Sequence, residues 1–253
     1  MGGSGHLGIL DWGIGGVGVY KLIKRRSPNA SIVYLSDTGA TPYGKMSRRE
    51  LVQRLDLVVG YLKSEGVTHL VIGCNAASTA IPHLAPPGIV TEGMILPAVR
   101  LAVKVRPSRL GLLGGRRTVL SGVYRRALAN EGIRVIQRIA QPLSGLIESG
   151  DVGSQILRLE AMRILDPLKS CSHVLLACTH YPAIAPVLQE FVNSETVLLD
   201  PASELVDNLD LGGVDEGGEV RFLTSGDPVA MRDAARNAFG IEIGRARRVD
   251  IGE

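Results

Sequence analysis

Short apolar runs alternate with longer amphipathic segments along the whole chain. The apolar runs are rich in Val, Leu and Ile and are bounded by polar or glycine-rich residues, a pattern typical of buried β-strands. They predict strands at 6–11, 31–37, 69–74, 88–91, 109–114, 134–140, 173–178, 196–200 and 220–226. The segments between them predict helices at 47–65, 94–105, 118–132, 154–168, 182–192 and 228–239, with a further helix after the glycine-rich turn at 13–18. Alternating strands and helices predict an α/β fold with mostly parallel sheets.

Two of the predicted strands end in the same way. VIGC runs into Asn75 and Ala76, and LLAC runs into Thr179 and His180, so each strand places a cysteine at its carboxyl end. Roughly half the chain separates these cysteines, which predicts two similar α/β domains that face each other across an active-site cleft. We expect a first domain of residues 1–96 plus 208–253 and a second domain of residues 97–207.

Composition narrows the class of protein. The chain has 253 residues, of which 45% are hydrophobic and 21% charged, as in globular proteins with a real core. A net charge of +3 does not favour nucleic acid or an anionic membrane as a partner. No apolar run approaches the ~18 residues of a membrane-spanning helix. Three cysteines without an export signal predict a cytoplasmic protein with free thiols.

The paired cysteines, Cys74 and Cys178, are the strongest chemical signal. A thiol at a strand end beside a helix N-terminus lies in a positive field, which we expect to lower its pKa and favour the thiolate. For either cysteine alone, a buried thiol that packs as a small hydrophobe is the better interpretation. Together they fit a coupled pair in which one sulfur is ionised while the other keeps its proton. Such a pair can take a proton from one face of a bound carbon and return one to the opposite face, without any cofactor.

Two neighbouring groups can assist these thiols. Asp11 ends the first strand, where it either exchanges a proton with a thiol or serves as a turn or capping carboxylate. His180 lies two residues past Cys178 and is either a second proton carrier or a structural histidine. The loop after Asp37 runs to Gly44 and either wraps a ligand or forms a long turn.

Two rival patterns are present. Residues 13–18 fit G-x-G-x-x-G after a strand, with Asp37 at the end of the next strand, which is the dinucleotide fingerprint of a nicotinamide dehydrogenase. That interpretation leaves both strand-end cysteines unexplained. Cys171-x-His173 and Cys178-x-His180 also suggest a metal site, but roughly 17–23 Å of extended strand would separate the two pairs, so we expect no metal and a structural Cys171.

The motifs occur in an order that resembles the glutamate racemase family of cofactor-independent aspartate/glutamate racemases. They are DWGIGG at 11–16, LSDT at 35–38, PYG at 42–44, CNAAS at 74–78 and CTHYP at 178–182, and the similarity extends to residues 114–124, 142–150 and 222–228. The resemblance implies interconversion of L- and D-glutamate for bacterial peptidoglycan, by an enzyme that is often a homodimer and uses no cofactor. It implies that Cys74 and Cys178 are the acid/base pair and that Asp11, His180 and Glu148 assist them. The positions that it assigns to the substrate site include Pro42, Tyr43, Gly44, Asn75, Thr118 and Thr179.

The chain departs from the family pattern at two positions of the predicted substrate site. Trp12 stands where the family usually has Ser, and Ala76 where it usually has Thr. Each lost hydroxyl removes a hydrogen bond to a charged substrate, at a cost of about 1.5–3 kcal/mol. Arg116 and Arg117, where small residues are usual, are a lesser departure. These changes keep open a related racemase or isomerase with another substrate and a weakly active homologue that binds a protein partner, with a dehydrogenase as a more distant alternative.

Overall fold

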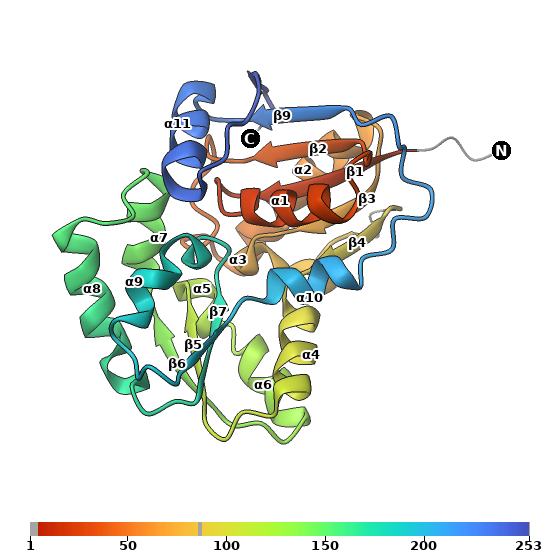
Figure 1. Cartoon of the computed structure of the whole chain (residues 1–253). Coiled ribbons are helices and arrows are strands. Elements are labelled where there is room, and N and C mark those ends of the chain that lie inside the picture. The colour runs from red at the N-terminus through yellow and green to blue at the C-terminus, as the bar shows by residue number, and fades with distance from the viewer. Residues whose placement is uncertain (1–4, 86–87, 253) are drawn as a thin grey trace.

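Two separate parallel sheets form the framework of the molecule. The computed structural model describes residues 5–85 and 88–252. The first sheet has the strand order β10-β9-β2-β1-β3-β4 and the second has the order β6-β5-β7-β8, with every pairing parallel. Figure 1 shows the first sheet in the upper part of the molecule and the second in the lower part. The predicted α/β fold with two mostly parallel sheets is confirmed.

The strands lie close to their predicted positions. Their bounds are β1 His6–Asp11, β2 Ile32–Ser36, β3 Val67–Ile72, β4 Val90–Gly93, β5 Leu110–Gly114, β6 Val135–Ile139, β7 His173–Ala177, β8 Val197–Leu199, β9 Val220–Thr224 and β10 Ala246–Arg248. The central strands β1, β2 and β5 are buried along nearly their full length, which is why they read as uninterrupted apolar runs.

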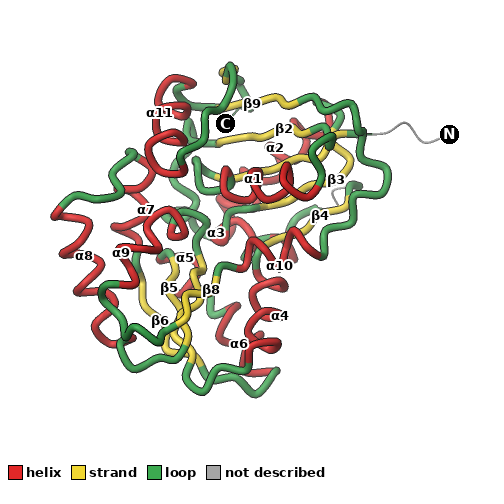
Figure 2. The backbone as a smooth tube through the Cα atoms, in the orientation of Figure 1, coloured by secondary structure: helices red, strands yellow, loops and turns green. Residues whose placement is uncertain are grey.

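Helices cover both faces of each sheet, as the tube in Figure 2 also shows. Their bounds are α1 Val17–Arg26, α2 Arg48–Ser64, α3 Asn75–Ser78, α4 Ile95–Val105, α5 Arg116–Leu120, α6 Val123–Asn130, α7 Gln141–Glu148, α8 Gln155–Leu165, α9 Ala185–Gln189, α10 Pro201–Asp207 and α11 Pro228–Phe239, with 3₁₀ turns at Ile81–His83, Asp166–Leu168 and Tyr181–Ile184. A complete capping box between Ser47 and Glu50 fixes the start of α2. None of the described helices has the length and apolar content needed to cross a bilayer.

Several elements differ from the sequence prediction. The single helix expected at 118–132 is two helices, α5 and α6, because Gly122 between them has a φ of 67° that favours glycine. The helix expected at 182–192 is a 3₁₀ turn followed by the short α9. The elements α7, α10 and β10 were not expected, and each has eight residues or fewer.

The chain crosses between the sheets and returns. Strands of residues 6–93 and 220–248 build the first sheet, and strands of residues 110–199 build the second. On the return, α10 packs against both α1 and α4. The exact domain limits, 96/97 and 207/208, stay a prediction, and residues 1–4, 86–87 and 253 of those spans lie outside the described residues.

Candidate active site

A cavity of about 400 Å³ lies where the carboxyl ends of the two sheets meet. Strands β1 and β3 of one sheet and β5 and β7 of the other all end at it. Its lining includes every residue that the sequence analysis placed in the substrate site: Asp11, Trp12, Pro42, Tyr43, Gly44, Cys74, Asn75, Ala76, Thr118, Cys178, Thr179 and His180. Glu148 is the one predicted assisting residue that does not line the cavity. Both strand-end cysteines therefore face a shared space, each supplied by a different sheet.

Cys74 lies just past β3, at the residue that precedes α3. Burial raises the pKa of its thiol well above the ordinary value, and the nearby Asp11 carboxylate raises it further, while the backbone amides of Ala76 and Ala77 lower it. The expectation that a helix N-terminus would lower the pKa of this thiol is therefore wrong. Helix α3 has only four residues, so its dipole is small beside the cost of burying a thiolate.

Cys178 directly follows β7 and has a different set of partners. Its Sγ lies 3.7 Å from Nδ1 of His180, and Nε2 of His180 lies 2.6 Å from Oε2 of Glu148. The same Glu148 oxygen accepts the backbone N–H of Ile14 at 2.9 Å, which fixes the carboxylate in place. Burial disfavours the charged imidazole, but the hydrogen bonds to Cys178 and Glu148 raise the pKa of His180 well above its usual value. This shift favours the protonated imidazole beside the sulfur, with the partly buried Glu148 carboxylate on its other side.

Asp11 occupies the equivalent place beside Cys74. It is fully buried at the end of β1, and its Oδ2 accepts the Thr179 hydroxyl at 2.7 Å across the two sheets. Burial raises the pKa of Asp11, while the positive His180 and the Thr179 hydroxyl lower it. The net shift is upward, so the folded protein disfavours the charged carboxylate relative to water.

Replacing Asp11 by Asn is expected to stabilise the protein near neutral pH. Because the folded pKa lies above the unfolded value, the unfolded chain loses this proton first as pH rises, and stability falls through the window between the two pKa values. The amide side chain of the Asp11→Asn variant carries no titrating proton, so the variant does not lose stability in this pH window. Its melting temperature should exceed that of the wild type at about pH 7, and the difference should shrink toward about pH 4. A variant that is less stable at neutral pH would show that the Asp11 charge stabilises the fold.

The glycine-rich turn at 13–18 has a role unrelated to nucleotides. A Cβ atom at Gly13 would overlap the Glu148 carboxylate, and one at Gly15 would overlap the Thr179 hydroxyl and lie 2.7 Å from Nδ1 of His180. These glycines therefore let the groups behind the cysteines approach the turn.

Asp37, the acidic residue of the dinucleotide pattern, is not available to a ribose. It is fully buried, and its carboxylate accepts two bonds from Arg54, at 2.9 and 2.7 Å, and one from the Tyr43 hydroxyl at 2.7 Å. The Ser225 hydroxyl donates to it as well. Asp37 thus anchors the loop that carries Tyr43 to the cavity, which argues against the dehydrogenase alternative.

Asn75 presents an unused donor at the cavity. Its Oδ1 accepts the Tyr124 hydroxyl at 2.5 Å, which holds the amide in one orientation. The amide nitrogen Nδ2 is buried and has no hydrogen-bond partner among the residues that the structure describes. A buried donor without a partner is costly in a folded protein, and a ligand oxygen in the adjoining cavity would satisfy it.

Sequence reasoning missed part of the second sheet's contribution. Gln141, Pro142, Ser144 and Gly145 of α7 line the cavity, together with Lys45, Gly115 and Ala177. The signal was a proline in the first turn of a helix, directly after the predicted strand 134–140. Trp12 and Ala76, the two departures from the family pattern, both line the cavity. Trp12 donates its indole N–H to the Ala40 carbonyl at 3.0 Å, which fixes the ring in the wall. Ala76 supplies no hydroxyl to that wall.

Two parallel sheets that meet over a cavity with one cysteine from each are the arrangement expected of an amino-acid racemase, an isomerase. The chain belongs to the Asp/Glu/Hydantoin racemase family, whose model matches residues 7–209.

Individual relatives agree with this assignment. The glutamate racemase of Pseudomonas putida is 33% identical over 247 residues, covering 90% of this chain and 92% of the relative. That of Listeria innocua is 30% identical and covers 98% of both chains. Among solved structures, glutamate racemase isoform RacE1 from Bacillus anthracis superposes with a TM-score of 0.87 at 26% identity and covers 97% of both chains.

Proposed function

We propose that this racemase interconverts L- and D-glutamate by a two-base proton transfer between Cys74 and Cys178, and so supplies D-glutamate for peptidoglycan. The observation that carries the proposal is that two thiols from two different sheets line one cavity, each beside its own ionisable partner. Asp11 serves Cys74, and His180 with Glu148 serves Cys178. No cofactor is needed, because each proton has a donor and an acceptor among these groups.

The chemical step is balanced between the two sulfurs. The thiolate on one side removes the α-proton, and the electron pair of the broken C–H bond delocalises into the α-carboxylate. The thiol on the other side then gives its proton to the opposite face of the carbon, and the configuration is inverted. One turnover exchanges the protonation states of the sulfurs, and Asp11 and His180 are placed to reset them through solvent.

The raised pKa of Cys74 bears on the resting state. Burial and Asp11 both favour the neutral Cys74 thiol, which suits Cys74 to donate the proton in the direction of reaction in which Cys178 is the base. The reverse reaction starts from the opposite arrangement. Substrate oxygens are held by the Asn75 amide nitrogen and by the Thr118 hydroxyl at the cavity wall, while the Thr179 hydroxyl stays bonded to Asp11.

An assay with several amino acids tests the substrate. Enantiopure L- and D-glutamate are incubated with the protein, and the optical rotation and chiral chromatography of each sample are followed to equilibrium. We expect both enantiomers of glutamate to reach the racemic mixture. Enantiopure aspartate, tested in the same way, is expected to racemise more slowly. Racemisation of another amino acid instead of glutamate would favour the second candidate, a racemase whose substrate is changed by Trp12 and Ala76, which both line the cavity. Binding of amino acids with no racemisation of any would contradict both candidates.

Replacing Tyr124 by Phe is expected to weaken substrate binding more than turnover. The change removes the hydroxyl that orients the Asn75 amide, but it replaces neither thiol and none of Asp11, His180 and Glu148. We expect KM to rise about tenfold, the value of one hydrogen bond to a charged group, with a smaller change in kcat. Steady-state kinetics in both directions measure this, and an unchanged KM would show that Tyr124 does not act through Asn75.

We also propose a cytoplasmic location and a homodimer. The three cysteines are all free, as is usual in a reducing compartment. Analytical ultracentrifugation over a range of concentrations tests the dimer.

A further inference from the structure

One buried carboxylate holds the loop of residues 38–44, which forms part of the cavity wall. Both oxygens of Asp37 accept a hydroxyl hydrogen, Oδ2 from Tyr43 and Oδ1 from Ser225, each at 2.7 Å. The Ser225 hydroxyl in turn accepts the backbone N–H of Gly39 at 3.0 Å. Asp37 therefore holds the loop both near its start and near its end.

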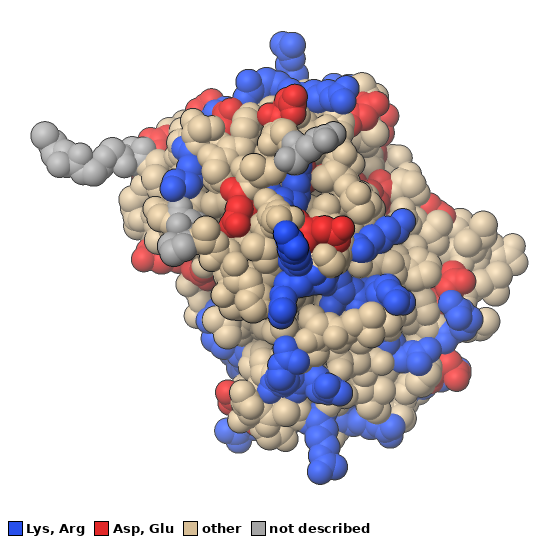
Figure 3. All heavy atoms as spheres, turned by 180° about the vertical axis from the view of Figure 1, so that it is seen from behind, with Lys and Arg blue, Asp and Glu red and all other residues tan. Residues whose placement is uncertain are grey.

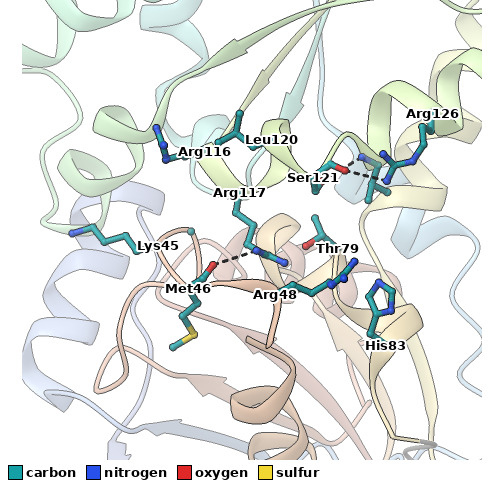
Figure 4. A pocket seen from close by; sticks show the side chains of 12 residues that line it. Lys45, Met46, Arg48, Thr79, His83, Arg116, Arg117, Leu120, Ser121 and Arg126 are labelled. Atoms are coloured by element: carbon teal, nitrogen blue, oxygen red, sulfur yellow. Dashed lines mark hydrogen bonds between the residues drawn. The ribbon is translucent and has the colours of Figure 1, made fainter. Parts of the chain in front are cut away.

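Loop 38–44 also reaches the second half of the molecule. A Cβ atom at Gly44 would lie 2.8 Å from Oε1 of Gln141, which belongs to α7 beside the second sheet. Figure 4 shows the chain just beyond the loop, where the Met46 carbonyl accepts a hydrogen bond from Arg117 of α5. A shift of the loop would therefore move part of the cavity wall and loosen its contacts with the second half.

Arg54 of α2 fixes the orientation of the Asp37 carboxylate. Its Nε donates to Oδ2 at 2.9 Å and its Nη2 to Oδ1 at 2.7 Å, the paired arrangement that gives a guanidinium–carboxylate pair its direction. Lys and Arg side chains seen in Figure 3 spread over the surface, whereas only 12% of the Arg54 side chain is exposed and Asp37 is fully buried. Within residues 5–85 and 88–252, Arg54 is the only cation paired with Asp37.

The carboxyl-terminal segment of residues 249–252 holds Arg54 from the other side. Nη1 of Arg54 donates to the Gly252 carbonyl. Val249 and Ile251 pack against the hydrophobic cluster between α2 and the first sheet, which keeps this segment in place. All three guanidinium nitrogens of Arg54 therefore have a partner, and the group is fixed at the Asp37 carboxylate.

We propose that Arg54 is a positioning residue of the active site, which acts through Asp37 to fix loop 38–44 and the wall that Tyr43 and Gly44 supply. Arg54 itself does not line the cavity. Without its guanidinium, the buried charge of Asp37 would lose its cationic partner, which is costly. The carboxylate would then turn toward solvent and draw Tyr43 away from the cavity. The kinetic consequence of this role rests on the proposed racemase function, but the position of the loop can be measured without substrate.

Trp12 provides that measurement, because it is the single tryptophan of the chain and its indole N–H bonds the Ala40 carbonyl within the loop. Acrylamide quenching of its fluorescence is compared between the full-length wild type and Arg54→Gln, without any ligand. We expect the quenching constant to rise about twofold or more in the variant, since a released loop uncovers the indole. An unchanged quenching constant in folded Arg54→Gln would overturn the proposal.

Steady-state kinetics of the same variant test the consequence for the active site. We expect KM for glutamate to rise about tenfold and kcat to change less than about threefold, because neither thiol lies on the loop. A wild-type KM would overturn the proposal. If no amino acid is racemised by the wild type, the proposed function fails, while the quenching of Trp12 still decides the role of Arg54.

Three further variants separate positioning from general stability. Arg49→Gln removes an exposed charge from the same helix, and Arg221→Gln breaks a partly buried ion pair with Glu65 at the opposite end of the first sheet. We expect neither to change the quenching constant or KM, although Arg221→Gln should lower the melting temperature. An equal rise in quenching with Arg221→Gln would show general loosening and would contradict the proposal.

Arg54→Lys is the conservative variant and decides the matter if Arg54→Gln does not fold. It keeps a positive charge beside Asp37 but lacks the planar pair of donors. We expect its quenching constant and its KM to lie between those of the wild type and those of Arg54→Gln. Wild-type values for both would show that the paired bonds are not needed and would overturn the proposal.

Discussion

Replacing either Cys74 or Cys178 by serine is expected to lower racemisation of glutamate by about 10³-fold or more in both directions. A serine hydroxyl is a far weaker acid than a thiol, so it neither forms the base nor returns a proton at a useful rate. Because inversion requires a base on one side of the carbon and an acid on the other, loss of one sulfur stops the full reaction even when the other is intact. Chiral chromatography of long incubations measures the residual rate.

Cys171→Ser is the matched control for these variants. Cys171 is buried in the core beneath β5 and β7, away from the cavity, and a Cβ at Gly111 would touch its sulfur. We expect racemisation close to the wild-type rate and some loss of stability, since a hydroxyl replaces a thiol in an apolar site. Racemisation at the wild-type rate by Cys74→Ser or by Cys178→Ser would refute the paired roles.

Replacing Gly15 by Ala is expected to lower kcat by about 10²-fold, although residue 15 takes no part in the chemistry. The new methyl group would overlap the Thr179 hydroxyl and press on His180. His180, beside Cys178, and the hydroxyl that donates to Asp11 would therefore both move. The backbone at Gly15 does not have a positive φ, so the effect comes from this contact and not from backbone strain. Steady-state kinetics together with the melting temperature separate a displaced site from a misfolded chain.

Gly18→Ala is the control within the same motif. A methyl group there would lie 3.5 Å from the Phe239 ring, an ordinary contact, and Gly18 lies inside α1, where alanine favours the helix. We expect unchanged kinetics and equal or higher stability. If Gly18→Ala reduced activity as much as Gly15→Ala, the turn would have a role that these contacts do not explain.

Most of the sheet framework could be predicted from local sequence. Buried parallel strands such as β1, β2 and β5 are apolar throughout and end in polar or glycine residues, so a single run of residues specifies them. The short α7 and α10 could not be found in this way. Each has eight residues or fewer, so packing against neighbouring elements stabilises it more than its own sequence does.

The candidate site could be predicted where residue type and position agree. Cysteines at two strand ends, Asp11 at a third and His180 nearby all reach one cavity, because parallel strands end at the same edge. The direction of the Cys74 pKa shift could not be predicted from the sequence. It depends on burial and on Asp11, which comes from a strand far away in the chain. The role of Gly13 and Gly15 could not be predicted either, because Glu148 and His180 lie far from them in the sequence and contact them only in the folded protein.

If two thiols act from opposite faces of one carbon, the product of a single turnover in heavy water takes its α-hydrogen from the solvent. The wild-type protein is mixed with L-glutamate in heavy water, and both enantiomers are separated and analysed by mass spectrometry early in the reaction. We expect D-glutamate that carries deuterium at its α-carbon, while the remaining L-glutamate is still unlabelled. Early D-glutamate that retains the original proton, or label that enters L-glutamate as fast as it enters the product, would mean that a single base serves both faces.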